Sequence, residues 1–215
     1  MATLQQIRET VSRKLQDPDN TSRSAVIVDA EINRSIRYYQ NYRFWFNDEL
    51  ATITLVAGQQ EVPNIPTDVI SELQVNGLTL VDSQQKIDLE KLSPADFVTR
   101  DYEQTGRPFF YMYRDREFLL LPTPQQAYPL IFRYLKKYDD LVDDGDTNDF
   151  TENAEDLIML HTLKNMYAED KQDPQLAGSY AELERSELKA LMERSNNRNS
   201  SGYVTSNTIL DNYYI

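Results

Sequence analysis

The stretch from Phe118 to Leu160 decides the fold, and it reads FLLLPTPQQAYPLIFRYLKKYDDLVDDGDTNDFTENAEDLIML. An apolar strand ends at Pro122-Thr123-Pro124, a second strand follows at residues 130–135, and an acidic loop then leads into an apolar helix. Proline has no amide donor for a sheet ladder, so it ends the first strand. The stretch therefore predicts that strands give way to helices at this point of the chain.

Helical patterns occupy the two ends of the chain. Apolar residues from Leu4 to Leu15 recur at helical spacing behind Thr3, which precedes Gln6 by three residues as in a capping box. Residues 23–42 form a second helical stripe, and the aromatic run Phe44-Trp45-Phe46 follows it. Since large aromatic residues are usually buried, we expect this run to belong to the core.

Two more helices are predicted near the C-terminus. The first covers residues 152–170 with Asp149 as its cap, because acidic residues suit the positive end of the helix dipole. The second begins at Asp173-Pro174 and continues to about Arg194, since proline is favoured in a first helical turn. Its apolar stripe is expected to contain Leu176, Tyr180, Leu183 and Leu191.

Strand patterns fill the middle of the chain. Asn76-Gly77 is a strong hairpin signal, because a type I′ turn needs two residues that tolerate positive φ. It predicts that residues 73–75 pair with residues 78–81.

A second hairpin is predicted between residues 109–113 and 117–121, with residues 130–135 as a third strand. Helices at both ends with strands between them predict an α+β fold. Its parts are a helical bundle formed by the N- and C-terminal helices (residues 1–46 and 150–194), an inserted small antiparallel β domain (residues 47–149) and an extended C-terminal tail (residues 195–215).

Composition limits the possible functions. The chain has 215 residues, 40% of them hydrophobic, with no apolar run near the roughly 20 residues that span a bilayer and no signal-peptide pattern. We therefore expect a protein that is intracellular, or assembled from intracellular parts, and that makes no membrane contact. A net charge of -13 argues against tight binding of nucleic acid by this protein. A negatively charged wall would nevertheless let a DNA duplex pass without sticking to it.

Few residues are available for catalysis. There is no cysteine, and the single histidine, His161, falls inside a helical pattern, where we expect a histidine on a helix face. Glu31 and Glu72 could be nominated as a carboxylate pair, but with 35 acidic residues such a pair can always be found. The six glycines form no phosphate-binding loop. We predict a chain without catalytic machinery or cofactor.

The acidic loop has one alternative as a calcium site. Asp144, Asp146, Asn148 and Glu155 stand at the first, third, fifth and twelfth positions of a helix-hand calcium loop. The sixth position holds Asp149 where the loop needs glycine, and the segment before the loop is a strand instead of a helix. A solvated turn without metal is therefore favoured.

The C-terminal tail changes composition from polar to aromatic and aliphatic. Such a segment suits docking on a partner, by adding a strand or inserting side chains. The alternative is a frayed terminus. The predicted docking residues are Tyr203, Val204, Ile209, Leu210, Tyr213, Tyr214 and Ile215.

The order of several motifs resembles that of tailed-phage head-to-tail adaptor proteins, and the resemblance covers nearly the whole chain. The motifs are the run from Ile32 to Arg37, Phe44-Trp45-Phe46, Gly58 with Val62-Pro63, Pro66-Thr67-Asp68, Leu120-Leu121-Pro122-Thr123-Pro124, the strand ending at Tyr134, and Leu141 before the acidic turn.

The resemblance implies a structural virion protein. Twelve copies would form a ring beneath the portal, extend the DNA channel and present a platform to the tail nozzle or tube protein. The C-terminal tail would dock on the portal, and double-stranded DNA would pass without specific binding. The protein would lie in the neck of the virion after assembly in the host cytoplasm. Two alternatives stay open, a virion-associated cell-wall hydrolase that uses paired carboxylates and a tail-terminator protein.

Overall fold

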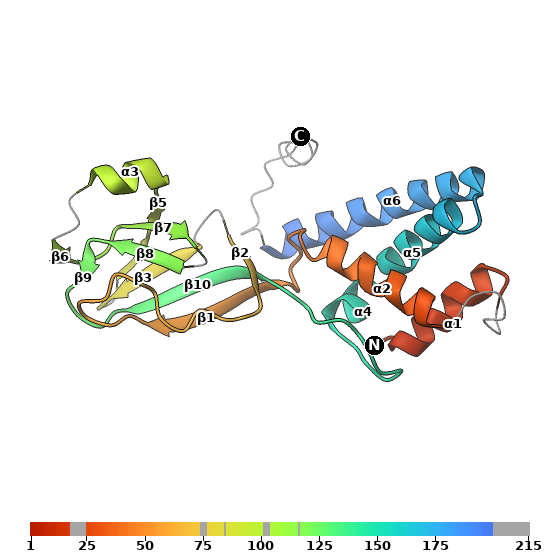
Figure 1. The fold of residues 1–215 in the computed structure, drawn as a ribbon, viewed down its shortest axis with the longest axis horizontal. Coiled ribbons are helices and arrows are strands. Elements are labelled where there is room, and N and C mark those ends of the chain that lie inside the picture. Colours follow the sequence, from red (N-terminus) through yellow and green to blue (C-terminus); the bar gives the residue numbers. More distant parts are fainter. Residues whose placement is uncertain (18–24, 74–76, 84, 101–103, 116, 200–215) are drawn as a thin grey trace. The chain divides into compact units, whose positions relative to one another are not determined.

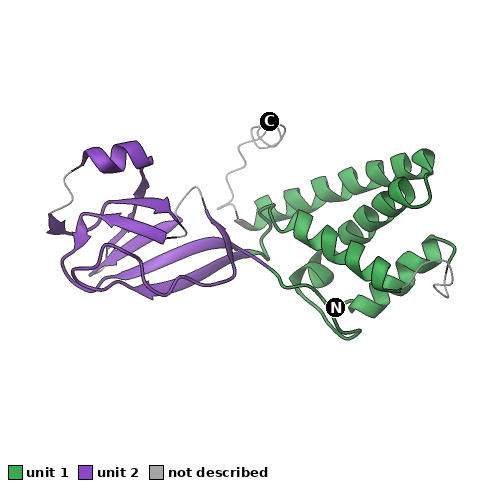
Figure 2. Cartoon of the chain, viewed as in Figure 1, with its two compact units in different colours: residues 1–47, 138–215 green, residues 48–137 purple. Residues whose placement is uncertain are grey.

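The chain folds into two compact units (Figure 2). The computed structural model describes residues 1–17, 25–73, 77–83, 85–100, 104–115 and 117–199. One unit, the helical unit, comprises residues 1–47 and 138–215, and the other, the β unit, comprises residues 48–137. The α+β fold class is confirmed (Figure 1).

The helical unit packs its helices around one apolar core. Its helices are α1 (Leu4–Lys14), α2 (Ala25–Tyr39), α4 (Asp149–Asn153), α5 (Glu155–Glu169) and α6 (Pro174–Asn199). Helix α2 packs against α1 and α5, and α5 packs against α6. The predicted capping box of Thr3 and Gln6 is confirmed, and the apolar stripe of α1 is buried in the core.

The C-terminal helices differ from their predicted form in two ways. The helix expected at residues 152–170 is two helices that meet at Ala154, and Asn148 replaces Asp149 as the cap, because its side chain accepts from two amides of the first turn. In α6, Leu176 and Leu183 are exposed. The buried face of α6 instead includes Ala177, Glu184, Leu191 and Ser195.

The β unit is built around β10. The largest sheet has the order β1-β10-β3-β4, and β2 also pairs with β10. These strands are β1 (Asp48–Thr54), β2 (Val69–Glu72), β3 (Leu78–Asp82), β4 (Gln85–Asp88) and β10 (Pro129–Lys136). A second sheet contains β5 (Glu90–Lys91), β7 (Phe110–Arg114) and β8 (Glu117–Leu121); a third contains β6 (Thr105–Gly106) and β9 (Thr123–Pro124); and α3 spans Pro94–Thr99.

The predicted hairpin at Asn76-Gly77 is wrong. Strands β2 and β3 do not pair with each other; they pair one after the other with β10. The N–H of Leu73 donates to the carbonyl of Arg133, and the N–H of Arg133 donates to that of Gly77. A Cβ on Gly77 would lie 2.2 Å from the Leu73 carbonyl oxygen, which explains the glycine. Residues 74–76, which include Asn76 and most of the predicted first strand, lie outside the described residues.

The second predicted hairpin is confirmed in part. Strands β7 and β8 pair antiparallel from Phe110 with Leu121 to Arg114 with Glu117. The strand expected at residues 130–135 is present as β10, but its expected place beside this hairpin is wrong, because β10 belongs to the larger sheet. The structure also groups residues 138–149 with the helices, since Tyr138 and Leu141 are buried in the helical core.

Within the described part of the chain, no helix is both long enough and apolar enough to cross a membrane.

Candidate functional site

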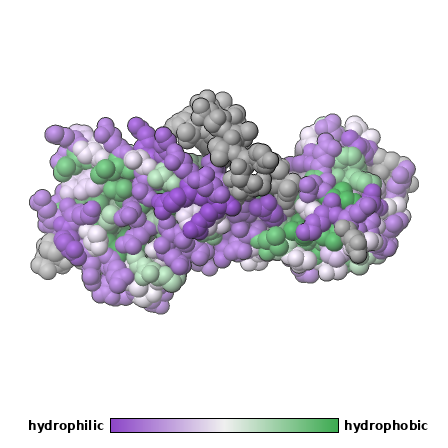
Figure 3. Space-filling view, turned by 180° about the vertical axis from the view of Figure 1, so that it is seen from behind, coloured by the Kyte–Doolittle hydropathy of each residue, from purple (hydrophilic) through white to green (hydrophobic). Residues whose placement is uncertain are grey.

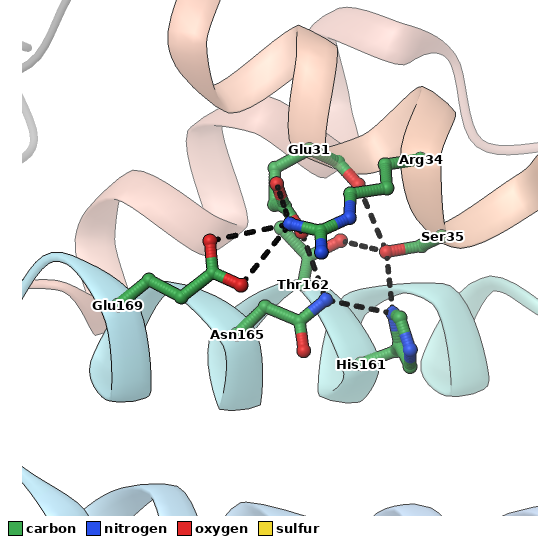
Figure 4. Close-up of polar contacts among 7 residues, drawn as sticks. All are labelled: Glu31, Arg34, Ser35, His161, Thr162, Asn165 and Glu169. Carbon is green, nitrogen blue, oxygen red and sulfur yellow. Dashed lines mark hydrogen bonds and ion pairs between the residues drawn. The ribbon is translucent and has the colours of Figure 1, made fainter. Parts of the chain in front are cut away.

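Polar side chains meet between α2 and α5 (Figure 4). Residues spaced by three or four positions lie on one face of a helix. Two facing helices therefore bring their polar residues together. We call this group the α2–α5 polar cluster; its members are Glu31, Arg34, Ser35, His161, Thr162, Asn165 and Glu169.

The centre of the cluster is the hydroxyl of Ser35, which is fully buried. Its Oγ lies 2.9 Å from the Thr162 hydroxyl, from Nδ1 of His161 and from the backbone carbonyl of Glu31. One hydroxyl has a single proton and two lone pairs. The three neighbours therefore belong to one hydrogen-bond network that joins the two helices.

His161 is neutral at pH 7 in this environment. Burial, followed by the nearby Lys164 ammonium, lowers its pKa to about 4. Nδ1 also lies 3.3 Å from the amide nitrogen of Asn165, which is a donor. A proton on Nδ1 would point at that donor and oppose it. The imidazole ring stacks on Tyr38 with centroids 4.9 Å apart.

The outer part of the cluster is made of ion pairs near solvent. Arg34 lies 3.2 Å from Glu169 and 3.4 Å from Glu31. The amide of Asn165 donates to Glu31 at 2.8 Å. Because such exposed pairs contribute little free energy, the buried centre is the part that fixes the helices.

Helix α6 joins the cluster through Glu184. This carboxylate is 8% exposed, lies 2.9 Å from Lys164 and accepts a hydrogen bond from Tyr39. Burial, and then the bond to Glu184, raise the pKa of the Tyr39 hydroxyl. A buried carboxylate is tolerated when it is paired and hydrogen-bonded. Glu184 therefore connects three helices.

Ser35, His161 and Glu184 are the residue types of an acyl-transfer triad. Nε2 of His161 lies 3.9 Å from Glu184. A triad serine must reach a substrate, however, and Ser35 has no exposed surface between the two helices. The arrangement can hold helices together but leaves a substrate no access to the hydroxyl.

The structure does not bring the calcium candidates together. Asp144 pairs with Arg8 at 2.8 Å, and Asp146 accepts from the amides of Val142 and Asp143. Those two bonds lower the pKa of Asp146. Asn148 caps α4, and Glu155 opens α5. Among the residues described, no three potential ligands form a metal group.

The acidic loop is attached to α1 and α2. The carbonyls of Asp144 and Asp146 accept from the amides of Gln5 and Leu4 in the first turn of α1, which lack partners within the helix. The amide side chain of Asn33 binds both the N–H and the carbonyl of Leu141. The loop is thus a structural turn that caps one helix and holds another.

The other candidate residues lie apart or outside the description. Glu31 belongs to the helical unit, whereas Glu72 belongs to the β unit and pairs with Lys91. The seven predicted docking residues, from Tyr203 to Ile215, fall outside the described residues. On the face drawn in Figure 3, hydrophobic residues form small separate patches among hydrophilic ones.

Sequence reasoning missed the polar cluster. Ser35 lies between Ile32 and Ile36 of a buried stripe, and His161 and Thr162 lie between Leu157 and Leu163 of another. Polar residues inside an apolar stripe were the available signal. Neither stripe alone predicts which of its residues meet residues of the other helix.

The model of the family described as SU10 adaptor protein matches residues 2–207. No curated protein matches the chain.

Proposed function

Because the chain belongs to the SU10 adaptor protein family, we propose that it joins the head of a tailed phage to its tail. Membership of this family supports a structural role as a bacteriophage adaptor. In the proposal, copies of the chain form a ring that lies beneath the portal in the neck of the virion and extends the DNA channel. The resemblance to head-to-tail adaptor proteins implies twelve copies. Assembly takes place in the host cytoplasm.

The observation that carries this proposal is the division into two units with separate cores. The helical unit and the β unit each bury their own apolar cluster. A protein that joins two different partners needs a stable surface for each of them. In the proposal the helical unit contacts the portal and the β unit contacts the tail nozzle or tube protein.

The C-terminal tail is the proposed portal-docking segment. The predicted tail begins at residue 195, but residues 195–199 belong to α6, and buried Leu191 and Ser195 hold this end of the helix in the helical unit. The Arg198 guanidinium also lies 4.4 Å from the centre of the Trp45 ring. The segment that carries the docking residues therefore follows a helix end that is held in place. They are Tyr203, Val204, Ile209, Leu210, Tyr213, Tyr214 and Ile215.

Charge supports passage of DNA without binding. Nine acidic residues and no basic ones occur between Asp139 and Asp156. Carboxylates repel phosphates, so a channel wall of this composition would not retain a duplex. No catalytic step forms part of the proposal.

Electron microscopy of the protein mixed with purified portal tests the function. We expect ring density beneath the portal. A chain that ends at Asn199 should fail to bind, and a full-length chain with the seven docking residues changed to serine is the control for tail length. Absence of a complex would overturn the proposal. Binding to the tail tube alone would identify a tail terminator, and clearing of peptidoglycan that Glu31→Gln abolishes would identify a hydrolase.

A further inference from the structure

Among the strands that the structure describes, β1 forms an open edge of the largest sheet. It pairs with β10 on one side and ends the strand order on the other (Figure 1). An edge strand presents unpaired amide and carbonyl groups to any chain that can add another strand.

The register identifies the outward positions. The amide of Leu55 donates to the carbonyl of Tyr128, and the two residues continue the β1–β10 register, so they form a hydrogen-bonded pair. Such pairs alternate along an antiparallel ladder. Residues 53, 51 and 49 therefore turn their backbone groups toward β10. The outward positions are Leu50, Thr52 and Thr54, all with exposed side chains.

The opposite edge of the same sheet is protected, whereas β1 is not. On β4, the bond from the Leu89 amide to the Leu78 carbonyl sets Lys86 and Asp88 as the outward positions. Charged residues at an edge discourage pairing with another chain. Residues 50–60 contain no charged residue, and Leu50 is 58% exposed.

The β1 edge is complementary to itself. If two copies meet antiparallel about Thr52, Thr52 opposes Thr52 of the other copy and Leu50 opposes its Thr54. Each of these pairs then exchanges two backbone hydrogen bonds. In this register Glu49 opposes Leu55, so no acidic residue faces another in a chain of net charge -13.

We propose that two copies of this chain pair through their β1 edges, antiparallel and centred on Thr52, to form one continuous sheet. The contact is isologous, so it closes with two copies and cannot by itself build a ring. It is a contact between free copies in solution. It therefore stands apart from the ring proposed above, and neither proposal depends on the other.

Single cysteines test the register, because the chain has none of its own. In the proposed pairing the two Cα atoms at position 52 would lie about 5.5 Å apart, within disulfide range. Thr52→Cys should therefore form a covalent dimer on mild oxidation. Leu50→Cys alone and Thr54→Cys alone should each form no covalent dimer, since equal positions lie more than about 10 Å apart. A mixture of those two should cross-link.

Lys86→Cys, an outward position of the protected β4 edge, is the matched control and should form no covalent dimer on oxidation. Sedimentation at increasing concentration gives a second measurement: the wild-type chain and a chain ending at Asn199 should both dimerise, and Thr52→Asp should not. The proposal fails if Thr52→Cys cross-links no more than Lys86→Cys, or if the mixture behaves like its components. It also fails if truncation at Asn199 abolishes the dimer, because the tail would then be the occupant of the edge.

Discussion

The two units bury different kinds of side chain. Among the described residues, the buried polar side chains belong to the helical unit with the exception of Thr79 in the β unit. Backbone ladders already satisfy the polar groups of strands, so apolar side chains complete that core. An α-helix makes its backbone hydrogen bonds within itself, so only side chains can fix its position against another helix. Here Ser35, His161 and Glu184 do so, which makes the helical unit dependent on specific partners and on pH.

The largest expected effect lies in the β core. Phe132 is 1% exposed at the centre of its cluster. Phe132→Ala should lower the free energy of unfolding of the β unit by about 3–5 kcal/mol, because it leaves a cavity. Far-UV circular dichroism would follow this transition. Trp45, the single tryptophan, lies in the helical unit, so the unfolding midpoint measured by its fluorescence should not shift. Equal shifts of both signals would mean that the two units unfold as one.

Acidification should destabilise the helical unit. His161 has a pKa of about 4 in the folded chain and about 6.5 when unfolded, so the unfolded state binds its proton first. The stability that neutral His161 confers is complete above pH 6.5 and is lost as the pH falls through 4, a change of about 3 kcal/mol. Unfolding followed by Trp45 fluorescence at several pH values measures it.

The control for that measurement is His161→Asn, which retains the titration of the carboxylates. Its stability should fall less between pH 6.5 and pH 4 than that of the wild-type chain. Identical pH profiles would show that His161 has no part in the acid sensitivity.

A smaller loss is expected at Glu184. Glu184→Ala leaves the hydroxyl of Tyr39 and the ammonium of Lys164 without their carboxylate. The cost should be about 1–3 kcal/mol in the helical unit, as for other buried groups that lose a partner. Glu187→Ala, which removes only the pair with Arg194 at the surface, should change the same denaturation midpoint little.

The smallest effect is expected at a helix cap. Asn148→Ala removes the acceptor for the amides of Phe150 and Thr151 and should cost about 1 kcal/mol. Asn148→Asp keeps the acceptor and should retain most of the stability. Thermal unfolding compares the two, and an equal loss in both would refute a capping role.

Local features were predictable from the sequence, and distant pairings were not. The capping box of Thr3 and Gln6 uses residues within one turn, and the β7–β8 hairpin joins neighbouring strands. The pattern at Asn76-Gly77 was misread because β10, far along the chain, pairs with the strands on both sides of it. Local turn chemistry cannot report a partner at that distance.

The candidate site follows the same rule. The residues of the acidic loop were identified, but their partners Arg8 and Asn33 lie more than a hundred positions earlier. Ser35 and His161 are 126 positions apart. Helical periodicity predicts the buried face of each helix, but it does not predict which residue of another helix that face meets.

The two crossings between the units have a mechanical consequence. The chain enters the β unit at Asp48 and leaves it after Lys137, and Asp48 pairs with Leu135, so both crossings lie at one end of the β1–β10 ladder. Tension between the units would pull both strands in the same direction. The ladder between them is then not sheared, and β10 passes the load to its other neighbours, β2 and β3. The chain thus resists pulling through two parallel attachments instead of one.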